Sequence, residues 1–174
     1  MKTLVIVSHP YPDNSNSIKS LEQVIQRLPD ITIRNLESLY DHDIANFDVA
    51  AEQAAYAGVD RVVFMFPVHW FNLTPMLKAY LNEVWSYGWA FGPEGTALKD
   101  KEMLVIATAG ATQFTYSKEG VINSTIEEVV TPMKACALYV GMKYSAPVAF
   151  YEAMNPSDEK LNEFKAVVTE RLGR

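Results

Sequence analysis

A chain of 174 residues suits one domain with a full hydrophobic core and is short for two. Hydrophobic residues make up 49% of it, too many for a disordered chain, and the formal charge of −6 with no basic run argues against a nucleic-acid surface. The single Cys136 excludes an internal disulfide, and no Cys/His cluster has metal spacing. No apolar run is long enough for a secretory signal or a membrane span. We therefore expect one domain over residues 1–174, in a soluble cytoplasmic protein that holds no metal.

Five short apolar runs divide the chain and alternate with helical patterns. The first run is apolar throughout and rich in β-branched residues, which is typical of a strand buried on both faces of a parallel sheet. Strands are predicted at Thr3–Ser8, Ile31–Leu36, Arg61–Phe66, Lys101–Ala107 and Tyr144–Phe150.

Helix caps mark the segments between these strands. Asn14 or Ser15 can cap the first helix, Thr74 precedes a proline at a first helical position, and Asn155 does the same near the end of the chain. The first predicted helix runs from its cap at Asn14 or Ser15 to about Leu28. The others are predicted over Asp48–Ala57, from Pro75 through Trp85, over Gly120–Val130, from Pro132 to near Gly141, and from Pro156 to about Leu172. Asp41–Asp43 and Tyr87–Gly95 are expected to be loops.

Strict alternation of strands and helices predicts an α/β fold with right-handed crossovers. We expect a flavodoxin-like three-layer sandwich, in which a five-stranded parallel sheet of order 2-1-3-4-5 carries helices on both faces. In such folds a ligand binds outside the carboxyl ends of the strands, where the strand order reverses. The loops that meet there are His9–Ser17, Pro67–Thr74 and Thr108–Tyr116.

The first loop offers hydrogen-bond donors that could bind one phosphate group. It lacks both GxGxxG and GxxxxGK[ST], which argues against a dinucleotide-binding Rossmann motif and a P-loop. Instead it places His9, Ser15, Asn16 and Ser17 around a helix N-terminus, where free N–H groups and the helix dipole favour an anion. A plain capped helix is the alternative interpretation.

The second and third loops suit a flat ring. Pro67, Val68, His69, Trp70 and Phe71 could offer backbone polar groups beside apolar side chains, which fits a heteroaromatic ring with polar edges; a core or subunit-contact role for the aromatic residues is the alternative.

Small side chains at Thr108, Ala109 and Gly110 would let the backbone approach such a ring, and Tyr116 could place a phenol near its reacting end. A tyrosine half-buried at a loop edge is the alternative interpretation for Tyr116.

Several short motifs occur together in a specific order. They are Ser8-His9-Pro10 with Asn16 seven residues after the histidine, Phe66-Pro-Val-His-Trp-Phe71, Leu77-Lys78, Tyr87-Gly88, Thr108-Ala-Gly110 followed by a tyrosine, and Gly141-Met142. With these motifs the chain resembles, over nearly its whole length, the flavodoxin-like NAD(P)H:quinone oxidoreductases. That family includes DT-diaphorase and shorter bacterial relatives, among them ancillary proteins of glutathione-gated potassium efflux.

The resemblance implies a non-covalent flavin, NAD(P)H as electron donor, a quinone-like acceptor and a homodimer with the site at its interface. By the same resemblance, His9, Ser15, Asn16 and Ser17 would surround the flavin phosphate. Pro67 to Phe71 would hold the isoalloxazine ring, and Thr108, Ala109 and Gly110 would contact its pyrimidine side. Tyr116 matches the family's active-site tyrosine. The absence of the C-terminal extension of DT-diaphorase favours FMN, with FAD possible.

Two positions depart from the family pattern. Ala107-Thr-Ala-Gly110 stands where relatives have Thr-Thr-Gly-Gly, and Gly120–Asn123 lacks the histidine proposed to assist proton transfer. His69 sits where relatives often have tyrosine and is a candidate proton source, so Tyr116 and His69 are the candidate catalytic residues. Trp85 and Trp89, with Trp70 and Phe71, are expected to wall the acceptor pocket.

These observations favour a flavin-dependent oxidoreductase that passes hydride by a ping-pong mechanism from NAD(P)H to a quinone or a similar electrophile. One alternative is a regulatory flavoprotein docked on a membrane potassium-efflux transporter. Another is a one-electron carrier like flavodoxin. We expect neither nucleic-acid binding nor membrane insertion.

Overall fold

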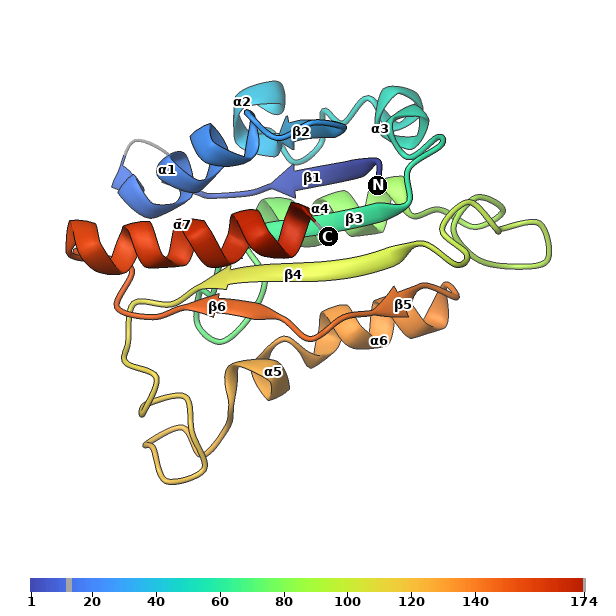
Figure 1. Cartoon of the computed structure of the whole chain (residues 1–174). Helices are drawn as coiled ribbons and strands as arrows, with labels where there is room; N and C mark the ends of the chain where they lie inside the picture. The colour runs from blue at the N-terminus through green and yellow to red at the C-terminus, as the bar shows by residue number, and fades with distance from the viewer. Residues whose placement is uncertain (12–13, 174) are drawn as a thin grey trace.

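The computed structural model describes residues 1–11 and 14–173 and shows a central sheet between two helical layers (Figure 1). The strands are β1 (Thr3–Val7), β2 (Ile31–Asn35), β3 (Arg61–Pro67), β4 (Glu102–Thr108), β5 (Lys143–Tyr144) and β6 (Val148–Phe150). The helices are α1 (Asn16–Ile25), α2 (Leu36–Tyr40), α3 (Val49–Ala55), α4 (Pro75–Val84), α5 (Ile126–Val129), α6 (Thr131–Tyr139) and α7 (Asp158–Gly173).

The strands run parallel in the order β2-β1-β3-β4-β5, and β6 also pairs with β4. This arrangement confirms the predicted flavodoxin-like order. In Figure 1 the carboxyl ends of the strands point to the left. The carboxyl edge, as we call this side of the sheet, is where the loops after β1, β3, β4 and β6 lie.

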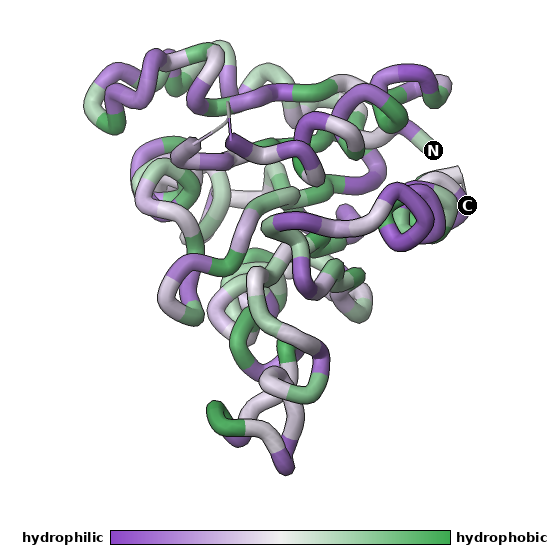
Figure 2. Tube along the Cα trace, turned by 90° about the vertical axis from the view of Figure 1, so that its left-hand side faces the viewer, coloured by the Kyte–Doolittle hydropathy of each residue, from purple (hydrophilic) through white to green (hydrophobic). Residues whose placement is uncertain are grey.

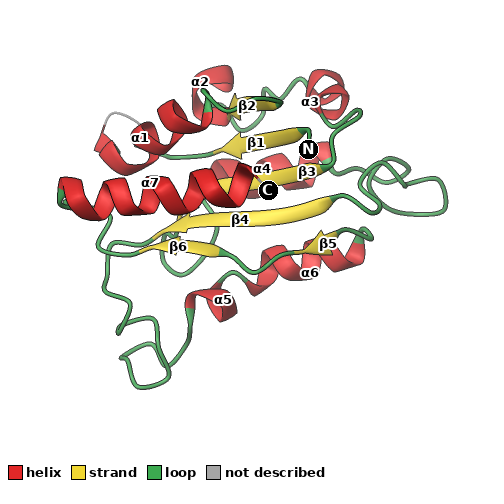
Figure 3. Ribbon diagram, viewed as in Figure 1, coloured by secondary structure: helices red, strands yellow, loops and turns green. Residues whose placement is uncertain are grey.

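Alternate residues of each central strand face two different helical layers. In β3, Val63 and Met65 pack with α1 and α7, whereas Val62 and Phe64 pack with α4 and α6. Figure 3 shows α7 crossing in front of the sheet and α4 behind it. Both faces are therefore buried, which explains why the central strands are apolar throughout.

The predicted fifth strand is two strands in the structure. The amide of Ser145 donates to the carbonyl of Met103 at 2.9 Å, which ends the β5 pairing, and β6 begins only at Val148. Pro147 lies between them and has no N–H to donate, so the ladder cannot continue through it.

Two helix predictions were wrong in extent, and one short helix was not predicted. Residues 120–125 are not helical: Asn123 has a φ of 47°, which lies in the left-handed region and interrupts a right-handed helix. Helix α7 begins after Ser157, whose side chain accepts from the amide of Lys160, so the cap is not Asn155. The short α2, capped by Asn35, begins at Leu36, the last residue of the predicted strand, and ends at Tyr40, just before the predicted loop Asp41–Asp43.

Among the described residues, no helix combines the length and apolar composition that crossing a bilayer requires.

Candidate functional site

The loops at the carboxyl edge are joined to one another by backbone hydrogen bonds. The amide of Val68 donates to the carbonyl of Thr108 at 2.8 Å, and the amide of Ala109 donates to the carbonyl of Phe150 at 2.8 Å. The ladder therefore continues past the last strand residues and fixes the loops after β3, β4 and β6 relative to each other. The three loops predicted from sequence do meet at this edge.

A fourth loop, between β6 and α7, also belongs to the edge, and the sequence interpretation missed it. The Ser17 hydroxyl donates to the carbonyl of Ala153 at 2.9 Å, and the amide of Ala153 donates to the carbonyl of Ala109 at 3.0 Å. Ala153 thus links the loop after β1 with the loop after β4. The sequence around Ala153 contains no motif that predicts these contacts.

The start of α1 presents backbone amides at the edge. Ser15 is the cap and its side chain accepts from the amide of Ile18 at 3.2 Å, while the first helical amides, of Asn16 and Ser17, precede the regular helical ladder and have no acceptor among the described residues. Asn16 is exposed there. Since the Ser17 hydroxyl already donates to Ala153, Ser17 can offer an anion only its amide. Positions 12–13 of this predicted loop lie outside the described residues.

His9 is a neutral hydrogen-bond donor at this helix terminus. Burial and, to a smaller extent, the nearby His69 together lower its pKa to about 4. Its Nδ1 accepts from the amide of Tyr11 at 3.0 Å, so the ring proton is carried by Nε2. A neutral imidazole with a fixed N–H can donate to a phosphate oxygen without bringing a charge.

Residues His69 to Asn72 form a tight aromatic turn. The amides of His69 and Asn72 donate to each other's carbonyls at 3.2 and 3.0 Å, and the two central residues, Trp70 and Phe71, have φ of 46° and 60°. Bulky residues rarely adopt positive φ, and such strain clusters at functional sites. Trp70 is 93% exposed and Phe71 46% exposed. These two aromatics are therefore not core residues.

The loop after β4 is close-packed under its surface. Thr108 and Ala109 are buried, whereas Gly110 is exposed and lies against the side chain of Met154, 3.3 Å from the position of an added Cβ. The side chain of Met154 therefore borders the exposed surface at Gly110. Met154 belongs to the fourth loop, which the sequence interpretation did not include.

Tyr116 lies between two aromatic rings. Its ring centroid is 6.1 Å from that of Phe71 and 5.9 Å from that of Tyr151. Burial raises the pKa of Tyr116, and burial together with Tyr116 raises the pKa of Tyr151. Both phenols therefore keep their protons at neutral pH. The contact between Phe71 and Tyr116 brings together two of the predicted site residues, and Tyr151 is a further aromatic that the sequence did not single out.

Trp85 and Trp89 belong to a different cluster. The indole N–H of Trp85 donates to the Tyr56 hydroxyl at 3.2 Å, and the Trp89 ring packs edge-on against Tyr56 at 5.2 Å. This cluster packs against α3. Within the single chain both tryptophans contact Tyr56, and the expectation that they wall the acceptor pocket stays a prediction.

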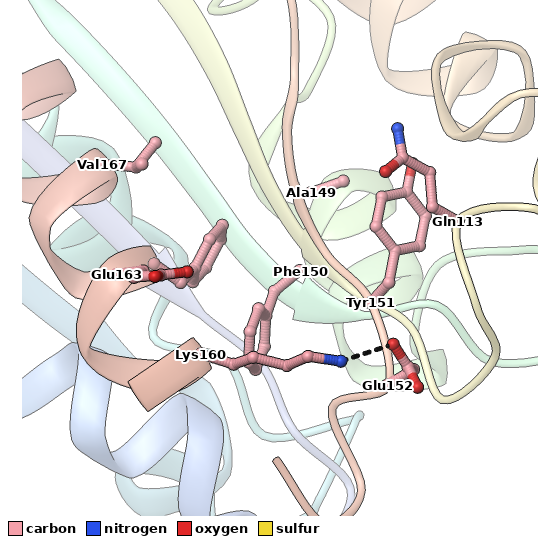
Figure 4. Close-up of a pocket in the computed structure, with 9 residues that line it drawn as sticks. Gln113, Ala149, Phe150, Tyr151, Glu152, Lys160, Glu163 and Val167 are labelled. Carbon is pink, nitrogen blue, oxygen red and sulfur yellow. Dashed lines mark hydrogen bonds and ion pairs between the residues drawn. The ribbon is translucent and has the colours of Figure 1, made fainter. Parts of the chain in front are cut away.

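A cavity of about 350 Å³ opens beside the fourth loop, between β6 and α7 (Figure 4). Figure 4 shows Lys160 reaching across it to Glu152, and their charged atoms lie 2.9 Å apart. Both side chains are half-exposed, so this ion pair contributes little stability. Tyr151 lines the cavity and also contacts Tyr116, so the cavity adjoins the carboxyl edge.

The segment between β4 and α5 projects away from the sheet at the same edge (Figure 2). Phe114 and Val121 on it are exposed. Within the described ranges 1–11 and 14–173, no three His, Cys, Asp or Glu side chains are grouped to hold a metal ion.

An open carboxyl edge with a helix N-terminus and an aromatic turn is the ligand edge of a flavodoxin-like fold. Residues 1–172 match the family model described as flavodoxin-like fold, so the chain belongs to this family. Among curated relatives, the uncharacterized NAD(P)H oxidoreductase YdeQ of Bacillus subtilis (strain 168) is 37% identical over 164 residues, which are 94% of this chain and 82% of the relative. The glutathione-regulated potassium-efflux system ancillary protein KefF of Klebsiella aerogenes is 35% identical, over 91% of this chain and 87% of that protein.

Two solved structures are similar over almost the whole chain. General stress protein 14 of Treponema denticola, in complex with FMN, superimposes with a TM-score of 0.88 at 32% identity and covers 99% of this chain and 97% of its own. A structure described as a thermophilic tryptophan halogenase of Streptomycin violaceusniger gives a TM-score of 0.93 at 34% identity and covers 98% of each chain.

Proposed function

We propose that the protein is a flavin-dependent NAD(P)H oxidoreductase that binds FMN non-covalently at the carboxyl edge. In this proposal it takes hydride from NAD(P)H and passes it, in a ping-pong sequence, to a quinone or a similar electrophile. The single observation that carries the proposal is that the α1 N-terminus and the aromatic turn both lie at the carboxyl edge, after the neighbouring strands β1 and β3. The FMN complex of a relative with the same fold and the oxidoreductase name of another support it. The halogenase name of one structure is not carried over, since it stands alone among these relatives.

The residues at the edge fit FMN. The amides of Asn16 and Ser17 and the Nε2–H of His9 offer donors for one phosphate group, and a helix N-terminus favours its charge. The exposed Gly110, which has no side chain, leaves its backbone open to a flat ring above the buried Ala109. When bound, FMN would supply the capacity to accept and release a hydride.

The protein's own groups would bind, orient and hold protons. Pro67, Val68 and the turn from His69 to Phe71 would face the ring with backbone groups, and Thr108 would fix that backbone through its bond to Val68. Ser15 would fix the first turn of α1. Tyr116, whose pKa is raised by burial, would hold a proton close to the acceptor, and His69 is the second candidate for this role.

We also place the site at the interface of a homodimer in the cytoplasm. Trp70 is 93% exposed in the single chain, and a large indole in that position is typical of a surface that a ligand or a second subunit covers. Sedimentation of the protein with and without FMN tests this part of the proposal, and a monomer under both conditions would contradict it.

The direct test of the function is to release and identify the flavin from purified protein, and then to measure oxidation of NADH and NADPH with a panel of quinones. We expect yellow protein, FMN in the supernatant and quinone-dependent turnover. Colourless protein that neither binds added FMN or FAD nor oxidises NAD(P)H would refute the proposal.

A second candidate function is an ancillary role at a potassium-efflux transporter, which the 35% identity to KefF favours. It predicts that the protein is captured by such a transporter in detergent and that its deletion disturbs control of potassium efflux. Normal efflux in the deletion strain would contradict it.

A further inference from the structure

Three buried polar residues lie together beneath the aromatic turn. Ser8 directly follows β1, Glu37 is in the first turn of α2, and Thr74 caps α4 at the exit of the turn. Ser8 and Thr74 are fully buried, and Glu37 is 3% exposed. The proposed ligand contacts use none of these side chains, although they join the segments that carry His9 and Trp70.

Their hydrogen bonds run in one direction. The amide of Leu77 donates to the Thr74 hydroxyl at 3.2 Å, and the Ser8 hydroxyl donates to Oε1 of Glu37 at 2.8 Å. Ser8 and Thr74 hydroxyl oxygens lie 2.6 Å apart. Since Ser8 has one proton and gives it to Glu37, Thr74 must donate to Ser8. The chain of bonds therefore starts at α4 and ends at the Glu37 carboxylate.

The carboxylate is only partly satisfied. Its other oxygen, Oε2, is buried and accepts no hydrogen bond from the described residues. A buried polar atom without a partner is costly and calls for an explanation. Fold stability alone does not explain it, because an apolar side chain at position 37 would avoid the cost.

The aromatic turn needs such an anchor. Trp70 and Phe71 are both at positive φ, and strained conformations persist only where the surroundings over-determine them. Pro67 and Val68 fix the entrance of the turn to β4, and Thr74 fixes its exit to Ser8. The strained residues lie between these two fixed points.

We propose that Glu37 is a positioning residue that holds the aromatic turn in its strained, ligand-facing shape through Ser8 and Thr74. The part of this inference that concerns flavin binding rests on the proposed function, whereas the part that concerns the turn does not. Glu37 need not touch the flavin: it acts by fixing two loops against each other.

A second buried carboxylate provides a matched control. Glu52 in α3 is fully buried and accepts from Arg34, Tyr40 and Tyr80, but from no residue of the edge loops. Glu52→Gln and Glu37→Gln both weaken a buried acceptor while preserving its shape. Only Glu37→Gln is expected to alter the aromatic turn.

The experiment measures hydrogen exchange of the His69 and Asn72 amides in FMN-free protein, and then FMN affinity and the visible spectrum of the bound flavin. Ser8→Ala and Glu37→Gln should each speed turn exchange about tenfold, raise the Kd for FMN about tenfold and shift the flavin spectrum. Glu52→Gln should lower Tm and leave these readouts unchanged. Thr74→Val should behave like Ser8→Ala, and Thr74→Ser should restore wild-type values.

Wild-type turn exchange in both Ser8→Ala and Glu37→Gln would overturn the inference, as would equal acceleration in Glu52→Gln. If Glu37→Gln does not fold, the comparison of Ser8→Ala with the Thr74 pair decides. If the wild-type protein binds no FMN, the proposed function fails, while the exchange comparison still decides whether Glu37 positions the turn.

Discussion

The imidazole rings of His9 and His69 lie 6.2 Å apart, edge to face, across the carboxyl edge. One follows β1 and the other follows β3, strands that are neighbours in the sheet. This contact joins the loop after β1 to the aromatic turn, and it helps to keep His9 uncharged.

We predict that His9 in FMN-free protein titrates near pH 4, because burial, with a smaller contribution from His69, lowers its pKa from the usual 6.5 to about 4. Histidine ring NMR across pH 3.5–8 measures this directly. His69→Phe should raise the midpoint only slightly, since burial is the larger cause.

The sign for stability follows from the same shift. Between pH 6.5 and 4 the unfolded chain binds the proton and the folded chain does not, so the contribution of His9 to the free energy of unfolding is lost as the pH falls through this window. His9→Asn should reduce that pH slope. A His9 midpoint near 6.5 would show that the ring is not buried as described.

Trp70→Gly should stabilise FMN-free protein by about 1 kcal/mol, because glycine accepts positive φ and the lost indole is almost fully exposed. The same change should weaken ligand binding or turnover, since it removes the aromatic surface. Urea unfolding and FMN titration of one preparation measure both effects. Loss of stability would mean that the indole makes contacts which the single chain does not show.

Asn16→Ala should weaken FMN binding by about 1–3 kcal/mol, because it removes the exposed side-chain amide next to the phosphate and leaves the backbone N–H in place. Asn162→Ala is the control, because Asn162 is also an exposed helical asparagine but lies in α7. Fluorescence quenching of FMN on binding gives both affinities. Equal affinities for the two variants would remove Asn16 from the site.

Tyr116→Phe should slow turnover with the acceptor and leave FMN affinity within about a factor of two, because the variant keeps the ring that packs on Phe71 and loses only the phenol proton. Since burial raises the pKa of Tyr116, the wild-type acceptor rate should stay flat from pH 7 to 9. Rapid-mixing kinetics over this range provide the measurement. Abolished FMN binding would show that Tyr116 holds the flavin instead.

The central strands could be predicted from the sequence because a strand buried on both faces is apolar throughout. Thr3 to Val7 is apolar throughout and becomes β1, and Thr74 before Pro75 caps α4 through the amide of Leu77. Failures came where local patterns were overruled by contacts. Gly120 to Asn123 contains no helix breaker except a glycine, yet the chain turns there: the amide of Asn123 donates to the carbonyl of Gly120 and Asn123 has a φ of 47°.

The loops that form the candidate site were predicted from the sequence, but the contacts between these loops were not. The pattern of strand ends indicated which segments meet, since parallel strands share one carboxyl edge. The pattern could not indicate that Ser17 donates to Ala153 or that Tyr151 contacts Tyr116. Nor could it indicate that Ser8 links Glu37 to Thr74 by hydrogen bonds. Such contacts depend on distances between segments far apart in the chain, which spacing within one segment does not encode.

The central claim is that one flavin at the carboxyl edge takes hydride from NAD(P)H and then passes it on. Anaerobic stopped-flow absorption of the FMN-loaded protein tests it in two mixings, first with NADH or NADPH and then with a quinone. We predict bleaching of the flavin band in the first mixing and its full return in the second, with no lasting semiquinone absorbance. A flavin band that neither NADH nor NADPH bleaches would contradict the account.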